Sequence, residues 1–146
     1  MKIYISGKIG TDTITDEIRD KFNVVAAIIE NCGHEIVNPV DPVHQNIGGS
    51  YLSNVPSDID DPYTRHLLYD LALIARCDAI FLLPDWQDSP GAKAELSFAA
   101  AIGKQIIVGS YTDTPPMAVL SHSLSLAINS KDMPKLLKSI GVSMPD

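Results

Sequence analysis

The sequence feature that most constrains the fold is an apolar run followed closely by a helix start. The run Asp78–Leu83 reads Asp-Ala-Ile-Phe-Leu-Leu. A short continuous apolar run is typical of a central strand that a parallel sheet buries on both faces. The dipeptide Ser89-Pro90 is typical of a helix start, because serine caps free backbone N–H groups and proline needs no N–H at the first helical position. The segment therefore predicts a strand, a tight loop and a helix.

The rest of the chain repeats this alternation of short strands and helices. Further strands are predicted at 2–6, 35–37 and 105–109, with helices at 15–31, from 61 and from 89 to about 103. Beyond them, residues 117–123 predict a short helix, 124–128 a fifth strand or a continuation of that helix, and 132–140 a terminal helix. This order predicts an α/β fold with a parallel four- to five-stranded sheet, right-handed crossovers and helices on both faces. Without repeats or linkers, residues 1–146 are expected to form a single domain.

Residues 40–61 show no clear hydrophobic period and contain two prolines and two adjacent glycines. Structureless connections longer than about 12–15 residues are usually functional lids or disordered segments. The segment therefore predicts either a lid over the strand ends or a loosely ordered surface loop.

Composition narrows the class of partner. The formal net charge is −7 and the pI is about 4.9, which argues against binding to nucleic acid or to an anionic membrane surface. No apolar run approaches the roughly 18 residues of a membrane span, and the first strand leaves no room for a signal peptide. The isolated Cys32 and Cys77 fit reduced thiols, so a cytoplasmic protein is expected. The scattered histidines lack metal-ligand spacing, so no metal site is predicted.

Several chemically active side chains are expected at the carboxyl edge of the sheet. Loops that follow parallel strands meet at this edge, where open α/β sheets bind ligands. Tyr4, Ser89 and Glu95 come from such positions, and Asp70 reaches the edge if its helix starts there. Paired carboxylates are the usual equipment for cleaving a bond at an anomeric carbon. Each residue also has a plain structural interpretation: Asp70 and Glu95 as solvated charges, Ser89 as a cap only and Tyr4 as a core aromatic.

Other candidate contacts come from charged and aromatic residues near the same loops. The loop from Gly7 to Gly10 is neither a dinucleotide-binding fingerprint nor a P-loop. Lys8, Arg65 and Lys93 could contact a phosphate, although each is more often a solvated charge. Trp86 could line a base pocket, pack on the core or contact a partner subunit.

Five segments together resemble the nucleoside 2-deoxyribosyltransferase superfamily, and more closely its small phage and bacterial branch. The resemblance extends over roughly residues 1–109 and rests on Lys2–Gly7, Gly33–Pro39, Asp70–Leu73, Cys77–Leu83 and Ser89–Glu95. It implies a flavodoxin-like or Rossmann-like three-layer sandwich. It also implies cleavage of the N-glycosidic bond of a 2′-deoxynucleoside or its 5′-monophosphate, with no metal or organic cofactor.

The same resemblance implies roles for individual residues. Glu95 is the expected nucleophile on C1′, Tyr4 orients it, and Asp70 assists departure of the base. Ser89 lies six residues before Glu95, where the nucleotide hydrolases related to Rcl carry a phosphate-contacting serine and the transferases carry an aspartate. Lys8 stands where those hydrolases have another phosphate-binding serine, and a lysine can hold phosphate as a point charge.

A segment near residue 121 resembles the part of those hydrolases whose serine reaches the phosphate in a neighbouring subunit. A homodimer or higher homo-oligomer with a shared site is therefore expected. The predicted catalytic residues are thus Glu95, Asp70 and Tyr4, and the predicted substrate-binding residues are Ser6, Gly7, Lys8, Ser89, Gly91, Ser121, Trp86 and Arg65.

The function predicted from the sequence is hydrolysis of a 2′-deoxynucleoside 5′-monophosphate through a glycosyl ester on Glu95. Two alternatives remain open: a 2′-deoxyribosyltransferase that exchanges bases between deoxynucleosides, and a non-catalytic nucleotide-binding module. For the chemistry, Glu95 is expected to be ionised unless burial raises its pKa strongly, and the nearby helix N-terminus opposes such a rise. Asp70 is expected to have a raised pKa in the complex with substrate, because it must act as an acid.

Overall fold

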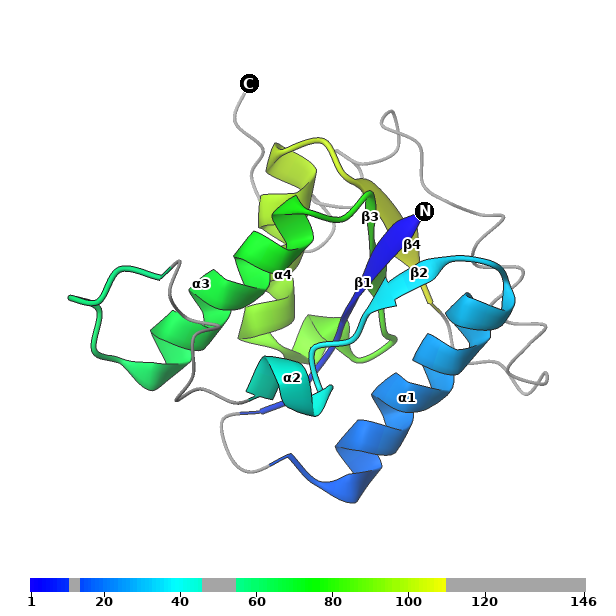
Figure 1. The fold of residues 1–146 in the computed structure, drawn as a ribbon, viewed down its shortest axis with the longest axis horizontal. Helices are drawn as coiled ribbons and strands as arrows, with labels where there is room; N and C mark the ends of the chain where they lie inside the picture. Colours follow the sequence, from blue (N-terminus) through cyan, green and yellow to red (C-terminus); the bar gives the residue numbers. More distant parts are fainter. Residues whose placement is uncertain (11–13, 46–54, 110–146) are drawn as a thin grey trace.

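The computed structural model describes residues 1–10, 14–45 and 55–109 of the 146-residue chain (Figure 1). Four strands and four α-helices lie in these ranges, together with a short 3₁₀ helix, η2 (Trp86–Asp88). The strands are β1 (Lys2–Ser6), β2 (Glu35–Val37), β3 (Ala79–Leu82) and β4 (Gln105–Val108). The α-helices are α1 (Asp16–Asn31), α2 (Pro42–Gln45), α3 (Pro62–Ala75) and α4 (Pro90–Ala101).

The four strands form one parallel sheet in the order β2-β1-β3-β4. Tyr4 of β1 pairs with Val37 on one side and with Ile80 on the other. The chain therefore leaves β1 toward one edge and returns on its other side to build β3 and β4. The carboxyl ends of β1 and β3 form the topological switch point, which is where open α/β sheets place their ligands.

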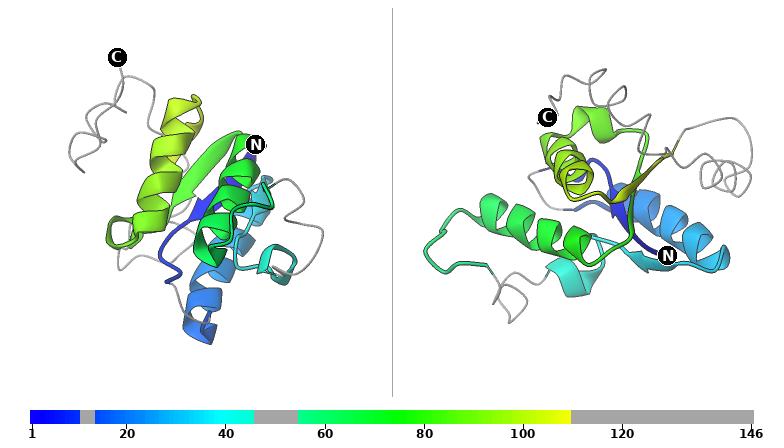
Figure 2. Two further views of the ribbon diagram at one scale, coloured as in Figure 1. Left: turned by 90° about the vertical axis from the view of Figure 1, so that its left-hand side faces the viewer. Right: turned by 90° about the horizontal axis from the view of Figure 1, so that it is seen from above.

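Helices cover both faces of this sheet (Figures 1 and 2), with α1 on one face and α3 and α4 on the other. The alternation of side chains along each strand produces two separate cores. Ile3 and Ile5 of β1 pack in the core beneath α1, whereas Tyr4 packs in the core beneath α3 and α4. The predicted α/β architecture, with a parallel sheet between two helical layers, is confirmed for the described residues.

Helices α3 and α4 begin where their serine or aspartate caps and prolines predict, and α1 begins one residue after its predicted start. The side chains of Thr15, Asp61 and Ser89 each accept a hydrogen bond from the backbone N–H of the residue three positions later. The donor–acceptor distances are 3.2, 2.8 and 3.1 Å, respectively. Pro62 and Pro90 open α3 and α4. Gly33 follows α1 with a φ of +87°, a conformation that glycine adopts without steric cost. These local signals fix where α3 and α4 begin along the chain, and the parallel topology brings both N-termini to the carboxyl edge of the sheet.

The segment 40–61 is not wholly irregular, because it contains the four-residue helix α2. The absence of a hydrophobic period concealed this helix, since four residues are too few to show one. Residues 46–54 lie outside the described part of the chain, so the lid and the loose loop both remain predictions. The elements predicted at 117–123, 124–128 and 132–140 also lie outside it, and the sheet described here has four strands.

Candidate active site

A pocket of about 320 Å³ opens at the carboxyl ends of β1 and β3. The loop after β1 and the first turns of α3 and α4 surround it, so the three elements converge as their order along the sheet predicts. Its volume lies within the usual range for small-molecule sites, about 300–1,000 Å³. The charged and polar side chains along it include Lys8, His66, Asp70, Asp88, Ser89 and Glu95.

Glu95 lies in the second turn of α4 and is only 6% exposed. The Tyr4 hydroxyl donates a hydrogen bond to its Oε2 atom, and the Ser6 hydroxyl donates one to Oε1 at 2.9 Å. Both donors come from β1 and lie two residues apart, so they project from the same face of the strand. Each carboxylate oxygen keeps a further lone pair. One strand therefore fixes the orientation of the carboxylate without saturating it.

Asp70 lies in the third turn of α3 and is 7% exposed. Its Oδ2 atom is 3.6 Å from Nε2 of His66, and its Oδ1 atom has no hydrogen-bond partner within the described residues. Burial, followed by the nearby charge of His44, lowers the pKa of His66. The imidazole that faces Asp70 is therefore neutral near pH 7. An orphaned buried oxygen of this kind calls for an explanation, and a ligand atom in the pocket supplies one.

The electrostatics of the two carboxyl groups differ in one important respect. Burial raises the pKa of Glu95 to about 7, although the hydrogen bonds from Tyr4 and Ser6 act in the opposite direction. Burial and the charge of Glu95 raise the pKa of Asp70 well above its usual range, and no comparable donors oppose this rise. This difference in hydrogen bonding favours the ionised form at Glu95 and the protonated form at Asp70. An ionised and a protonated carboxyl group beside one pocket suit the roles of nucleophile and acid.

The Tyr4 hydroxyl is protonated near pH 7. Burial, followed by the charges of Asp70 and Glu95, raises the pKa of its hydroxyl well above the usual value. The pKa of Asp70 is raised in this structure, whereas its rise in a complex with substrate stays a prediction. For Glu95, the condition under which the sequence no longer ensures ionisation is met, because burial raises its pKa strongly.

The start of α4 supplies polar groups suited to an anion. The Ser89 Oγ atom accepts a hydrogen bond from the Ala92 N–H at 3.1 Å and keeps its own proton to donate. The first N–H groups of a helix carry partial positive charge and bind phosphates readily. Because Gly91 has no side chain, a ligand can approach the backbone closely at this position. A Cβ atom there would lie 3.1 Å from the Tyr63 hydroxyl oxygen. Lys8 lies on the same pocket wall, whereas the Asp88 carboxylate opposes binding of an anion.

The structure brings most of the predicted site residues together. Tyr4 and Ser6 contact Glu95 directly, and the pocket lining includes Gly7, Lys8, Asp70, Ser89, Gly91 and Glu95. Sequence reasoning missed Tyr63, Gln45 and His66 as lining residues. For His66 a signal was present, because it precedes Asp70 by four residues and so shares its helix face.

Two predicted substrate contacts lie elsewhere. Trp86 is 3% exposed and packs in the core beneath α3 and α4, which is the plainer of its sequence interpretations. The Arg65 guanidinium donates to the carbonyl oxygens of Pro56 and Ile59, at 2.7 and 2.8 Å. It therefore anchors the chain before α3, and neither residue lines the pocket. Ser121 lies outside the described residues, so its predicted role in a shared site is untested.

The described ranges 1–10, 14–45 and 55–109 contain no group of three or more His, Cys, Asp or Glu side chains that could hold a metal ion. No helix in these ranges is both long enough and apolar enough to cross a membrane.

Comparison with known proteins gives a family match and a similar solved structure. A family model described as a domain of unknown function, DUF4406, matches residues 1–108. Among solved structures, the chain is similar to the Clostridium botulinum CMP N-glycosidase BcmB, with 17% sequence identity and a TM-score of 0.44 over 95% of this chain and 97% of that chain. A comparison with curated proteins gives no match.

Proposed function

We propose a hydrolytic function for this chain, which belongs to the DUF4406 family of domains of unknown function. In this proposal it cleaves the N-glycosidic bond of a 2′-deoxynucleoside 5′-monophosphate and releases the free base and 2-deoxyribose 5-phosphate. The observation that carries the proposal is the unequal pair of buried carboxyl groups. Glu95 receives two hydrogen bonds from β1, whereas Asp70 presents an unpartnered oxygen beside the same pocket.

In the first step, a Glu95 carboxylate oxygen bonds to C1′ as the bond between C1′ and the base nitrogen breaks. The bonding electrons pass to the base, which takes the proton of Asp70 and leaves as a neutral molecule. In the second step, a water oxygen bonds to C1′ and the ester bond to Glu95 breaks. The water proton passes to Asp70, so both carboxyl groups return to their starting states.

The phosphate is assigned to Lys8, Ser89 and the first turn of α4. A dianionic phosphate there would interact with the Lys8 ammonium charge and accept hydrogen bonds from the Ser89 hydroxyl and from backbone N–H groups of the helix. The choice of a phosphorylated substrate follows from Ser89, which occupies the position that carries a phosphate-contacting serine in the hydrolases the sequence resembles. The choice of a 2′-deoxy sugar follows from the resemblance to the nucleoside 2-deoxyribosyltransferase superfamily. The serine at this position, where the transferases carry an aspartate, also favours hydrolysis over base exchange.

The test uses purified full-length chain with each of the four deoxynucleoside monophosphates, and separates the products by chromatography. Ribonucleotides and unphosphorylated deoxynucleosides run in parallel, so that the assay also tests the sugar and the phosphate. Glu95→Gln should abolish release of the base. Glu30→Gln, the same change at an exposed position of α1, should leave the rate unaltered.

The proposal fails if the unaltered chain releases no base from any deoxynucleotide, or if Glu95→Gln releases it at the same rate. Addition of a second free base separates hydrolysis from transfer, because only a transferase converts that base into a new nucleotide or nucleoside. Rapid quenching followed by mass spectrometry should detect the deoxyribosyl phosphate ester on the peptide that contains Glu95.

A further inference from the structure

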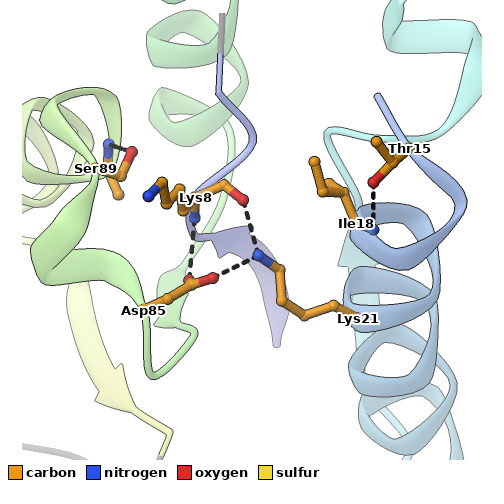
Figure 3. A network of polar contacts seen from close by, with 7 residues as sticks. Lys8, Thr15, Ile18, Lys21, Asp85 and Ser89 are labelled. Atoms are coloured by element: carbon orange, nitrogen blue, oxygen red, sulfur yellow. Dashed lines mark hydrogen bonds and ion pairs between the residues drawn. The ribbon is translucent and has the colours of Figure 1, made fainter. Parts of the chain in front are cut away.

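The backbone of Lys8 is held on both sides by charged side chains from distant parts of the sequence. Its N–H donates a hydrogen bond to Oδ1 of Asp85 at 3.1 Å, and its carbonyl oxygen accepts one from Nζ of Lys21 at 2.8 Å. The same Lys21 ammonium forms an ion pair with Oδ2 of Asp85 (Figure 3). Lys21 and Asp85 thus close a ring of polar contacts around a single residue of the pocket loop.

This ring lies at a tightly packed junction. The side chains of Lys21 and Asp85 are only 20% and 25% exposed, so their attraction is less screened than that of a surface pair. The preceding residue, Gly7, leaves no spare room, because a Cβ atom there would lie 2.7 Å from Cδ1 of Leu83 and 3.1 Å from Oδ1 of Asp85. The loop after β1 is therefore fixed against the loop after β3.

The side chain of Lys8 is directed differently from its backbone. It is exposed, lines the pocket and extends toward Ser89, away from Asp85 (Figure 3). No ion pair of this ammonium group occurs within the described residues. The carboxylate of Asp85 accepts a hydrogen bond from the Lys8 backbone N–H, but its negative charge is already neutralised by the Lys21 ammonium group. The Lys8 charge is consequently left for an anion in the pocket.

We propose that Lys21 and Asp85 are positioning residues for phosphate recognition: they hold the Lys8 peptide, and Lys21 keeps Asp85 from pairing with the Lys8 ammonium. The identity of the anion as a phosphate rests on the proposed function, whereas the arrangement of Lys8, Lys21 and Asp85 does not depend on it. A merely structural clamp would stabilise the loop without favouring phosphorylated ligands. The positioning role instead makes the effect of Lys21 depend on Lys8 and on the phosphate.

The test compares Lys21→Met with Arg19→Met in the full chain. Both changes remove one positive charge from α1. Among the residues that the structure describes, the Arg19 guanidinium pairs with the exposed Asp16, at 3.9 Å. Lys21→Met should raise KM for a deoxynucleoside monophosphate about tenfold, which corresponds to ~1.4 kcal/mol. The corresponding deoxynucleoside should keep its kcat/KM, and Arg19→Met should change neither substrate. Lys21→Arg should restore most of the lost affinity.

A double-mutant cycle tests whether Lys21 acts through Lys8. The double variant Lys8→Met/Lys21→Met should bind the nucleotide no more weakly than Lys8→Met alone, because the ammonium that Lys21 protects is already absent. Additive losses would overturn the proposal, as would an equal loss for nucleotide and nucleoside. If Lys21→Met does not fold, Lys21→Gln removes the same charge and replaces it in every comparison.

Direct binding separates this inference from the proposed function. Calorimetric titration with inorganic phosphate should show binding that Lys21→Met weakens and Arg19→Met preserves. That result, in a protein that turns over no nucleotide, would support the positioning role and refute the glycosidase. Normal turnover with a phosphate affinity insensitive to Lys21 would support the glycosidase and refute the positioning role.

Discussion

Replacing Glu95 with glutamine should change how the stability of the fold depends on pH. Burial raises the pKa of this carboxyl group to about 7 in the folded chain, against an ordinary value of 4.5. The folded state therefore favours the protonated form. The contribution of Glu95 to stability is fully present below about pH 4.5 and is lost as the pH rises through about 7. Glutamine does not titrate, so the variant lacks this loss.

The size of the effect follows from the two pKa values. Between pH 5 and pH 8, linkage predicts that the ionisation of Glu95 removes about 2–3 kcal/mol from the free energy of unfolding. Asp70 acts in the same direction, because removal of the Glu95 charge takes away one cause of its raised pKa. Between pH 5 and pH 8, the free energy of unfolding of Glu95→Gln should therefore rise relative to that of the unaltered chain by at least this amount.

Urea denaturation followed by circular dichroism measures the free energy of unfolding at both pH values. The quantity of interest is the difference between Glu95→Gln and the unaltered chain, since the titration of all other groups largely cancels in it. Glu30→Gln, at an exposed position of α1, should show no such trend. A difference for Glu95→Gln that stays constant between the two pH values would refute the argument that burial governs this carboxyl group.

Three further substitutions test the site. Tyr4→Phe removes a donor to Glu95, so the rising limb of the kcat profile should move to higher pH, and kcat measured across pH checks this. Asp70→Asn removes the acid and should slow base release by about 10²–10⁴-fold. The loss should be far smaller for a substrate with an N7-methylated purine, because this base leaves without protonation, and rates measured in parallel for the two substrates test the difference. Gly7→Ala places a Cβ atom 2.7 Å from Cδ1 of Leu83 and should lower the free energy of unfolding by about 1–3 kcal/mol, as urea denaturation measures.

Local signals account for most of what the sequence predicts correctly. The starts of α1, α3 and α4 depend on caps and prolines within a few residues of each other, so a linear pattern contains the necessary information. The meeting of Glu95 with β1 follows from topology, because a parallel α/β sheet brings these loops to one edge. The alternation of strands and helices, together with the capping signals, therefore sufficed for the outline of the candidate site.

What the sequence could not predict depends on packing between distant residues. Burial of Glu95 decides the direction of its pKa shift, and no local pattern reports burial. Trp86 and Arg65 lie beside the expected loops, yet one packs into the core and the other bonds to the preceding loop. The ion pair between Lys21 and Asp85 joins residues 64 positions apart. A sequence pattern names such residues without showing where their side chains go.

The alternation along β1 connects the fold to the chemistry of the site. Ile3 and Ile5 enter one core, while Tyr4 enters the other and, with Ser6, donates to Glu95. A register shift of one residue would exchange these faces and give a buried carboxylate two isoleucines in place of two hydroxyls. The hydrophobic pattern that stabilises the sheet therefore also disfavours a one-residue shift that would take Tyr4 and Ser6 away from Glu95. The register of β1 and the packing of α4 on the sheet together bring the two donors to Glu95.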